Sequence, residues 1–182
     1  MPELPEVETI ARQISNGYAG KRIEAINAVP GIIFQNISAH DYQLALKGKI
    51  LSCVERYGKF MIWNVGNLFP VFHLGMSGIF ISDKSHSLYP HHIHIEYHFE
   101  DGTHLYFQDV RKFSKIILYH QRPSFDHLGI DPTHKNFTLN NFRKLLTLKK
   151  ATLKSLLMNQ AVLAGIGNIY ASEILFDCGI HP

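Results

Sequence analysis

The first three residues, Met1, Pro2 and Glu3, place groups that could do chemistry at the start of the chain. A small second residue such as proline allows the initiator methionine to be removed, which would leave a secondary amine beside the Glu3 carboxylate. An unprotonated amine attacks carbonyl-like carbons and forms a Schiff base. An α-amine has a pKa of about 8, against about 10.4 for lysine, so a useful fraction is unprotonated at neutral pH. We therefore expect Pro2 to be a nucleophile and Glu3 its partner in proton transfer.

The same stretch also has the pattern of a helix over residues 5–16, which gives its carboxylates a second explanation. Pro5 suits the first helical position, and acidic residues favour the positive end of a helix. The apolar residues fall on one face: Val7, Ile10, Ala11 and Ile14. The pair Asn16-Gly17 is expected to end this helix.

After this helix the period changes from about four residues to two. Eight segments read as short strands, separated by Gly, Pro, Asn and Asp: residues 21–29, 49–57, 59–65, 69–76, 78–82, 92–99, 103–110 and 115–120. Within 92–99, alternation places Ile93, Ile95, Tyr97 and Phe99 on one side. Residues 100–103 supply a hairpin turn. So many short strands predict an antiparallel sandwich or barrel.

The helical period returns in the C-terminal third. Helices are expected over residues 138–150, 151–163 and 168–178, with Asn168 as an N-cap and Gly179 just past the end. Two helices joined by a short glycine-containing turn form a unit of the helix-turn-helix kind. The expected fold is therefore α+β, with domains at 1–130 and 131–182.

Charge is distributed unevenly although the net charge is only +3. No Asp or Glu occurs from Pro132 to Ser172, whereas this segment holds six basic residues: Lys135, Arg143, Lys144, Lys149, Lys150 and Lys154. Such a segment is typical of a surface that binds a polyanion, and a solvated lysine face of a helix explains it equally well. The absence of a signal peptide and of a long apolar run favours a cytoplasmic location.

Six motifs together resemble the bacterial formamidopyrimidine-DNA glycosylase family, in the same order and at matching intervals. They are "MPELPEVET", "GKF", "HLGMSG", "DVRKF", "HLGIDP" and "GIGNIYASEILF", and the likeness covers essentially all 182 residues. With Leu4, the N-terminus resembles that of the branch that removes 8-oxoguanine and formamidopyrimidines, rather than that of the endonuclease VIII branch. The resemblance implies an N-terminal β-sandwich followed by part of a helix-two-turn-helix domain. It also implies a bifunctional DNA glycosylase and AP lyase of base excision repair, in a bacterial, nucleoid-associated setting.

The resemblance also implies roles for individual residues. Pro2 becomes the Schiff-base nucleophile, Glu3 the proton donor, and Lys59 the lysine that assists β-elimination. The implied DNA contacts are His73, His92, Arg111, Lys149, Lys154 and Asn168. Met76, Arg111 and Phe113 resemble the residues that fill the space left by a flipped base, with Arg111 donating to the orphaned partner base. Any such enzyme must extrude the damaged nucleotide from the stack.

Family members continue beyond this point with the rest of the helical domain and a four-cysteine zinc finger. The resemblance therefore implies a truncated helical domain, no zinc or other cofactor in this chain, and a monomer that binds damaged duplex DNA and no membrane. A non-catalytic DNA-binding remnant of the same fold is the main alternative. A metal-binding β-protein is another, because four histidines crowd one expected strand: His91, His92, His94 and His98. Alternation would place the last three of them on one face.

Overall fold

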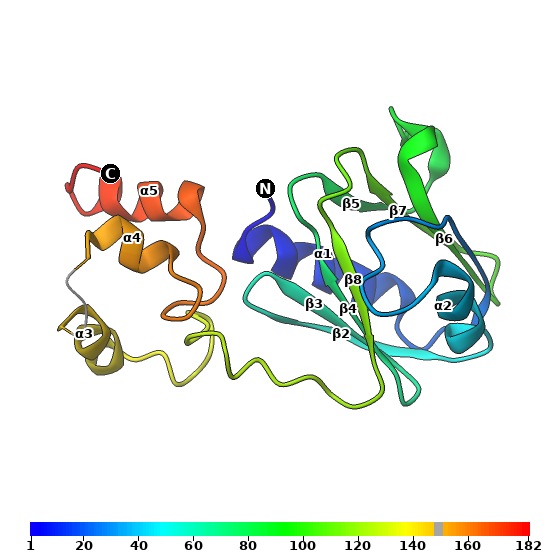
Figure 1. Cartoon of the computed structure of the whole chain (residues 1–182), viewed down its shortest axis with the longest axis horizontal. Helices are drawn as coiled ribbons and strands as arrows, with labels where there is room; N and C mark the ends of the chain where they lie inside the picture. The colour runs from blue at the N-terminus through cyan, green and yellow to red at the C-terminus, as the bar shows by residue number, and fades with distance from the viewer. Residues whose placement is uncertain (148–150) are drawn as a thin grey trace. The chain divides into compact units, whose positions relative to one another are not determined.

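The computed structural model describes residues 1–147 and 151–182, which divide into two units (Figure 1). The first unit comprises Met1–Pro2, Glu6–Arg56 and Phe60–Pro123. The second comprises Glu3–Pro5, Tyr57–Lys59 and Ser124–Pro182. Two short segments from the N-terminal part of the chain thus belong to the second unit. The domain limits of 1–130 and 131–182 stay a prediction.

Two four-stranded sheets make up most of the first unit, with orders β1-β6-β7-β5 and β2-β3-β4-β8. The strands are β1 (Ile23–Ala28), β2 (Leu51–Tyr57), β3 (Phe60–Val65), β4 (Phe69–His73), β5 (Gly78–Ile81), β6 (Ile93–Phe99), β7 (His104–Asp109) and β8 (Lys115–Tyr119). Each falls within a segment that has the two-residue period. The predicted sandwich is therefore confirmed.

Aromatic side chains fill the core of the sandwich. Trp63, Phe72, Phe80, Tyr97 and Phe107 pack with ring centroids 4.9–5.7 Å apart. The alternation predicted in β6 is confirmed on its inner face, since Ile93, Ile95, Tyr97 and Phe99 are all buried. The hairpin at residues 100–103 is also present, closed by the Gly102 N–H, which donates to the Phe99 carbonyl at 2.9 Å.

Helix α1 (Leu4–Tyr18) buries the predicted face, but it ends later than expected. The Asn16-Gly17 pair does not end the helix; it continues to Tyr18, whose hydroxyl donates to the His104 carbonyl at 2.7 Å. The Tyr18 ring also packs against Phe99, with centroids 4.9 Å apart. Tertiary packing therefore outweighs the local stop signal.

Helix α2 (Ala39–Leu46) was not expected from the sequence, and it packs beside β1 (Figure 1). Its N-cap is Ser38, whose Oγ accepts from the Asp41 N–H at 3.0 Å. Tyr42 and Leu46 are fully buried, and the Tyr42 and Tyr97 hydroxyls share a 2.7 Å hydrogen bond. Two short 3-10 helices, η1 (Lys84–His86) and η2 (Pro90–His92), precede β6.

The second unit contains helices α3 (Leu139–Thr147), α4 (Leu153–Met158) and α5 (Asn168–Asp177) around a small apolar core. Helix α4 is shorter than the predicted 151–163. After it the chain turns, and Leu163 forms a parallel bridge with Ile130. Gly179 follows α5 as predicted, with a φ of 67°, and the Ile180 N–H donates to the Leu175 carbonyl. None of the described helices combines the length and apolar character that a membrane crossing requires.

Candidate active site

The Glu3 carboxylate lies at the N-terminus of α5 and is only 1% exposed. Its Oε2 accepts from the Gly167 N–H at 2.7 Å and from the Tyr170 N–H at 3.2 Å. Its Oε1 accepts from the Ile169 N–H at 2.9 Å. These are amides of the first turn, where the helix dipole favours negative charge. Glu3 therefore caps a helix that begins 165 residues later in the chain.

This arrangement corrects the predicted cap of α5. Asn168 is the first residue of the helix, and Gly167 occupies the N-cap position without a side chain to offer. A cap from a distant residue replaces the local one. Asn168 is left with its side chain exposed at the helix start.

Lys59 lies next to Glu3 and is 8% exposed. Burial lowers the pKa of the Lys59 amine from its usual value, although the Glu3 carboxylate acts in the opposite direction. A larger fraction of this amine is therefore unprotonated than in a solvated lysine. A buried lysine of this kind can act as a base.

Gly167 leaves the space in which both groups fit. A Cβ at this position would lie 2.3 Å from Glu3 Oε1 and 2.8 Å from Lys59 Nζ. The Leu4 N–H donates to the Gly165 carbonyl at 3.0 Å, which fixes the residue that follows Glu3. The absence of a side chain at 167 is therefore a requirement of the geometry.

A second buried carboxylate, Asp131, holds the turn that carries Lys59. Its Oδ2 accepts from the Gly58 N–H at 2.9 Å, and its Oδ1 accepts from the Thr133 N–H at 2.9 Å. The Tyr57 hydroxyl donates to the Gly129 carbonyl at 2.8 Å. The Gly58 N–H and the side chain of the preceding Tyr57 are thus held, which anchors the turn directly before Lys59.

The N-terminal residues are accessible. Met1 is 47% exposed and Pro2 is half-buried. The Pro2 nitrogen is in a peptide bond as long as Met1 is present, and its removal would create an amine directly before the buried Glu3.

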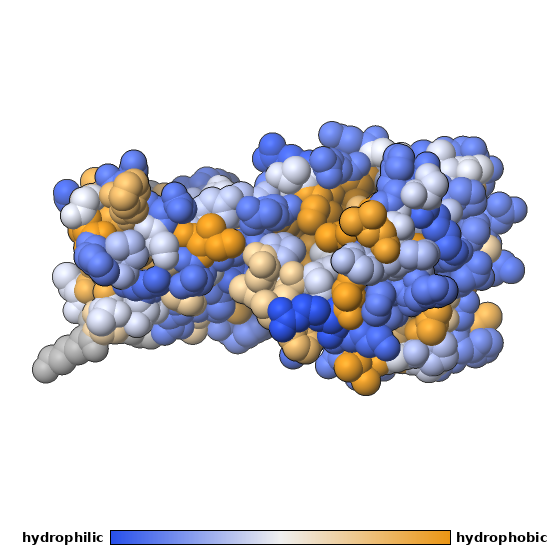
Figure 2. Space-filling view, turned by 90° about the horizontal axis from the view of Figure 1, so that it is seen from above, coloured by the Kyte–Doolittle hydropathy of each residue, from blue (hydrophilic) through white to orange (hydrophobic). Residues whose placement is uncertain are grey.

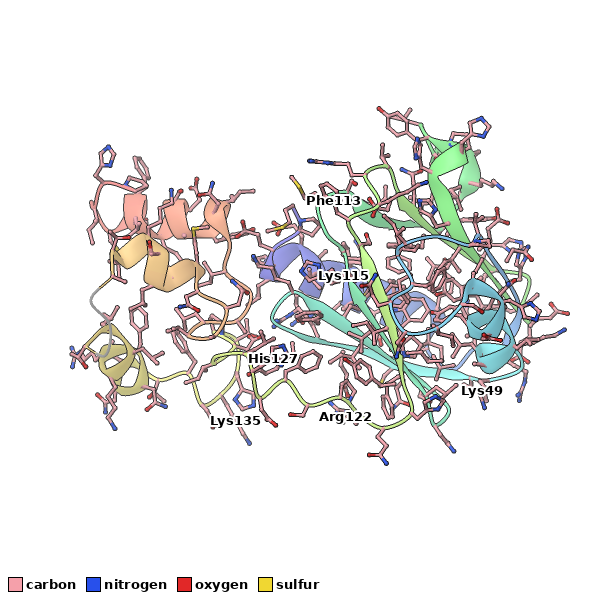
Figure 3. The ribbon with its side chains drawn as sticks, viewed as in Figure 1. Lys49, Phe113, Lys115, Arg122, His127 and Lys135 are labelled. Carbon is pink, nitrogen blue, oxygen red and sulfur yellow. The ribbon has the colours of Figure 1, made fainter. Side chains whose placement is uncertain are left out.

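Two loops of the first unit carry the residues predicted to fill the space of a flipped base. Met76 lies in residues 74–77, between β4 and β5. Arg111 and Phe113 lie in residues 110–114, between β7 and β8, and Phe113 is labelled in Figure 3. Met76 and Phe113 are 44% and 52% exposed. The face drawn in Figure 2 carries hydrophobic residues in small groups among hydrophilic ones. The Arg111 guanidinium lies over the Phe113 ring, 4.7 Å from its centroid.

The two loops touch at Gly75. A Cβ at this residue would lie 2.5 Å from the Phe113 carbonyl carbon, so there is no space for a side chain. The φ of Gly75 is 59°, in the left-handed region, which also favours glycine. The Gly75 N–H donates to Nδ1 of His73 at 3.3 Å. An accepting Nδ1 leaves the proton of a neutral His73 ring on Nε2. The structure thus brings His73, Met76, Arg111 and Phe113 onto connected segments.

The remaining predicted DNA contacts lie elsewhere on the two units. His92 ends η2 in the first unit, and Lys154 lies half-buried on α4 in the second. Lys149 lies outside the described residues. The expected face of three histidines does not form: His92 precedes β6, and His94 is buried with its Nε2 donating to the Asp109 carbonyl at 2.9 Å.

A metal site is not formed by the described residues, among which no three His, Cys, Asp or Glu side chains cluster. The sequence holds two cysteines, Cys53 and Cys178, and so does not supply the four cysteine ligands of the zinc finger that family members carry.

Sequence reasoning missed three residues that organise these sites: Gly167, Asp109 and Asp131. Asp109 and Asp131 stand inside the quoted motifs "DVRKF" and "HLGIDP", but their burial depends on contacts distant in sequence. A glycine directly before an expected helix start was the available signal for Gly167.

The comparisons cover nearly the whole chain. Residues 1–116 match the formamidopyrimidine-DNA glycosylase N-terminal domain, and residues 128–182 match the formamidopyrimidine-DNA glycosylase H2TH domain. A formamidopyrimidine-DNA glycosylase from a Wolbachia strain of Brugia malayi is 38% identical, and one from Lactobacillus delbrueckii is 35% identical. Each alignment covers 100% of this chain and 68% of the relative.

Solved structures give the same result. The Lactococcus lactis enzyme bound non-covalently to DNA with an AP site is 31% identical, with a TM-score of 0.87, over 99% of this chain and 71% of that one. A MutM complex with DNA containing carbocyclic 8-oxo-G has a TM-score of 0.82 at 30% identity, over 96% and 67% of the two chains. Since both halves match and the relatives exceed 30% identity over the full chain, this chain belongs to the formamidopyrimidine-DNA glycosylase family.

Proposed function

We propose that this chain excises oxidised purines, 8-oxoguanine and formamidopyrimidines, from duplex DNA and then cleaves the strand as an AP lyase. The observation that carries the proposal is the buried Glu3 carboxylate, which follows Pro2 directly and is fixed by three backbone amides. Relatives bound to DNA with an AP site or with 8-oxo-G support the substrate class.

In this proposal the amine of Pro2 attacks C1′ of the extruded nucleotide, and the glycosidic bond electrons leave with the base. Glu3 takes the proton from the amine and delivers it to the sugar ring oxygen, so that the ring opens to an iminium. The Lys59 amine, in its unprotonated form, then removes a C2′ proton, and the 3′ phosphate departs. Water hydrolyses the imine and frees Pro2.

The partner is damaged duplex DNA. His73, His92, Lys154 and Asn168 are proposed to contact phosphates, Asn168 through its exposed side chain at the start of α5. Met76 and Phe113 are proposed to enter the stack, and Arg111 to donate to the orphaned base. The family likeness supports these roles, and the exposure of both loops is consistent with them. We further propose that the chain acts as a monomer without a metal or other cofactor.

Borohydride trapping tests the nucleophile. The chain is incubated with an abasic-site duplex and reduced, and mass spectrometry establishes whether Met1 has been removed. We expect one covalent adduct per chain from protein that starts at Pro2, and none from a matched chain with a blocked N-terminus. An equal adduct from the blocked chain would show that another amine reacts. DNA binding with no adduct from either chain would establish the non-catalytic DNA-binding alternative.

A further inference from the structure

Asp109 is a buried carboxylate that the proposed mechanism does not use. It is the last residue of β7 and is fully inaccessible to solvent. Its Oδ1 accepts from Ser77 Oγ at 2.5 Å and from the Arg111 N–H at 3.2 Å, and its Oδ2 accepts from the Ser114 N–H at 2.9 Å. A buried charge is tolerated only with such partners.

The partners of Asp109 come from both of the exposed loops. Ser77 follows Met76 in the first loop, while Arg111 and Ser114 stand on either side of Phe113 in the second. Ser77 Oγ also accepts from the Arg111 N–H at 3.0 Å, and Ser114 Oγ donates to the Leu74 carbonyl at 3.0 Å. One carboxylate therefore fastens the two loops to each other.

The charge of Asp109 strengthens the hydrogen bonds that hold the two loops. Burial alone would raise the pKa of Asp109, but the hydrogen bonds from Ser77, Ser114 and the Arg111 N–H outweigh burial and lower it. The group stays charged, and charge-assisted hydrogen bonds are the stronger kind. His94 Nε2 donates to the Asp109 carbonyl and fixes its backbone as well.

We infer that Asp109 is a positioning residue, which aims Arg111 at the orphaned base and thereby sets the preference for cytosine opposite the lesion. This inference rests on the proposed function. The Arg111 side chain is exposed, so burial does not orient it, whereas its own backbone N–H is held by Asp109 and Ser77. In Asp109→Asn, one carboxylate oxygen is replaced by an NH2 group, which cannot accept a hydrogen bond. The loop whose donors face this NH2 group would therefore be released.

The test measures equilibrium binding to duplexes that carry a tetrahydrofuran site opposite cytosine or adenine, which requires no catalysis. We expect the preference for cytosine to fall about tenfold in Asp109→Asn, within the range that a bidentate arginine contact supplies. In an Arg111→Ala background, Asp109→Asn should not lower the preference further. Asp101→Asn is the control, because Asp101 also accepts two hydrogen bonds, from Thr103, and pairs with Lys21, but stands in the 100–103 hairpin. It should keep the wild-type preference.

Several outcomes would overturn the inference. A wild-type chain without preference for cytosine, or an Asp109→Asn chain that loses affinity equally for both duplexes, would leave Asp109 with only a structural role. If circular dichroism shows that Asp109→Asn does not fold, the same binding measurement is made on Ser77→Ala, which removes one acceptor of the Arg111 N–H. An unchanged preference for cytosine in Ser77→Ala also overturns the inference. A loss of preference together with no borohydride adduct would contradict the proposed catalysis and leave the positioning role intact.

Discussion

Replacing Gly167 by alanine tests the geometry of the Glu3 site most directly. The φ of Gly167 is −123°, which alanine adopts without strain, so the effect comes from the added Cβ alone. That atom would lie 2.3 Å from Glu3 Oε1, 2.4 Å from its Cδ and 2.8 Å from Lys59 Nζ. Non-bonded carbon and oxygen atoms do not approach so closely, and therefore the carboxylate or the helix start has to move.

The magnitude follows from the hydrogen bonds that such a movement breaks. Glu3 accepts from the amides of Gly167, Ile169 and Tyr170, and a hydrogen bond to a charged group contributes about 1.5–3 kcal/mol. Loss of one or two of them should lower the free energy of unfolding by about 2–4 kcal/mol. For a chain of this size the midpoint of thermal unfolding should fall by roughly 5–15 °C. Displacing Glu3 by about 1 Å should slow adduct formation by about a hundredfold.

Circular dichroism during heating and single-turnover borohydride trapping measure the two effects. Gly17→Ala is the matched control, because Gly17 lies in α1 and a Cβ there meets nothing within 4 Å. We expect this control to be neutral or stabilising by about 0.5–1 kcal/mol. A Gly167→Ala chain that unfolds and traps like the wild type would refute the close approach of Glu3 to the start of α5.

Three further predictions concern other parts of the chain. Burial lowers the pKa of Lys59, so the rate of strand cleavage at a preformed abasic site should rise with pH at values below pH 10.5. Lys59→Met should abolish this rise, and an unchanged pH profile in the variant would exclude Lys59 as the base. Ser38→Ala removes the N-cap of α2 and should cost about 1 kcal/mol in denaturant unfolding, whereas no change would mean that the cap is replaced by water. Lys154→Ala should reduce the slope of log affinity against log salt by about 1, and an identical slope would place Lys154 away from the phosphates.

Local periodicity was sufficient to predict the sandwich. In β6 and β8 every second residue is buried, and a two-residue period is a property that short segments carry by themselves. The position where α1 ends was not predictable in the same way, since Tyr18 is held by Phe99 and His104 from another part of the chain. Helix α2 could have been found from the Ser38 cap and the buried Tyr42 and Leu46, which share one helix face.

The candidate site was predicted unevenly for a similar reason. Motif likeness named Pro2, Glu3 and Lys59 as a group, but only tertiary structure shows what holds the last two. Lys59 depends on Asp131, which anchors Gly58 from a position 73 residues away. A contact of this kind produces no periodic pattern in the sequence, because it needs only one buried carboxylate and one backbone amide.

The cap on α5 shows why such a site can be both structural and chemical. Standard capping rules search for a side chain within a few residues of the helix start, and at α5 they point to Asn168. The structure instead uses a carboxylate from the N-terminus, so the helix gains its cap only when Glu3 is in place. The same amides hold the carboxylate still, which is what a proton-transfer group requires in order to act without reorganising. The same three hydrogen bonds therefore stabilise α5 and hold the carboxylate for which we propose a catalytic role, and a substitution at Glu3 has to be judged by unfolding and by trapping together.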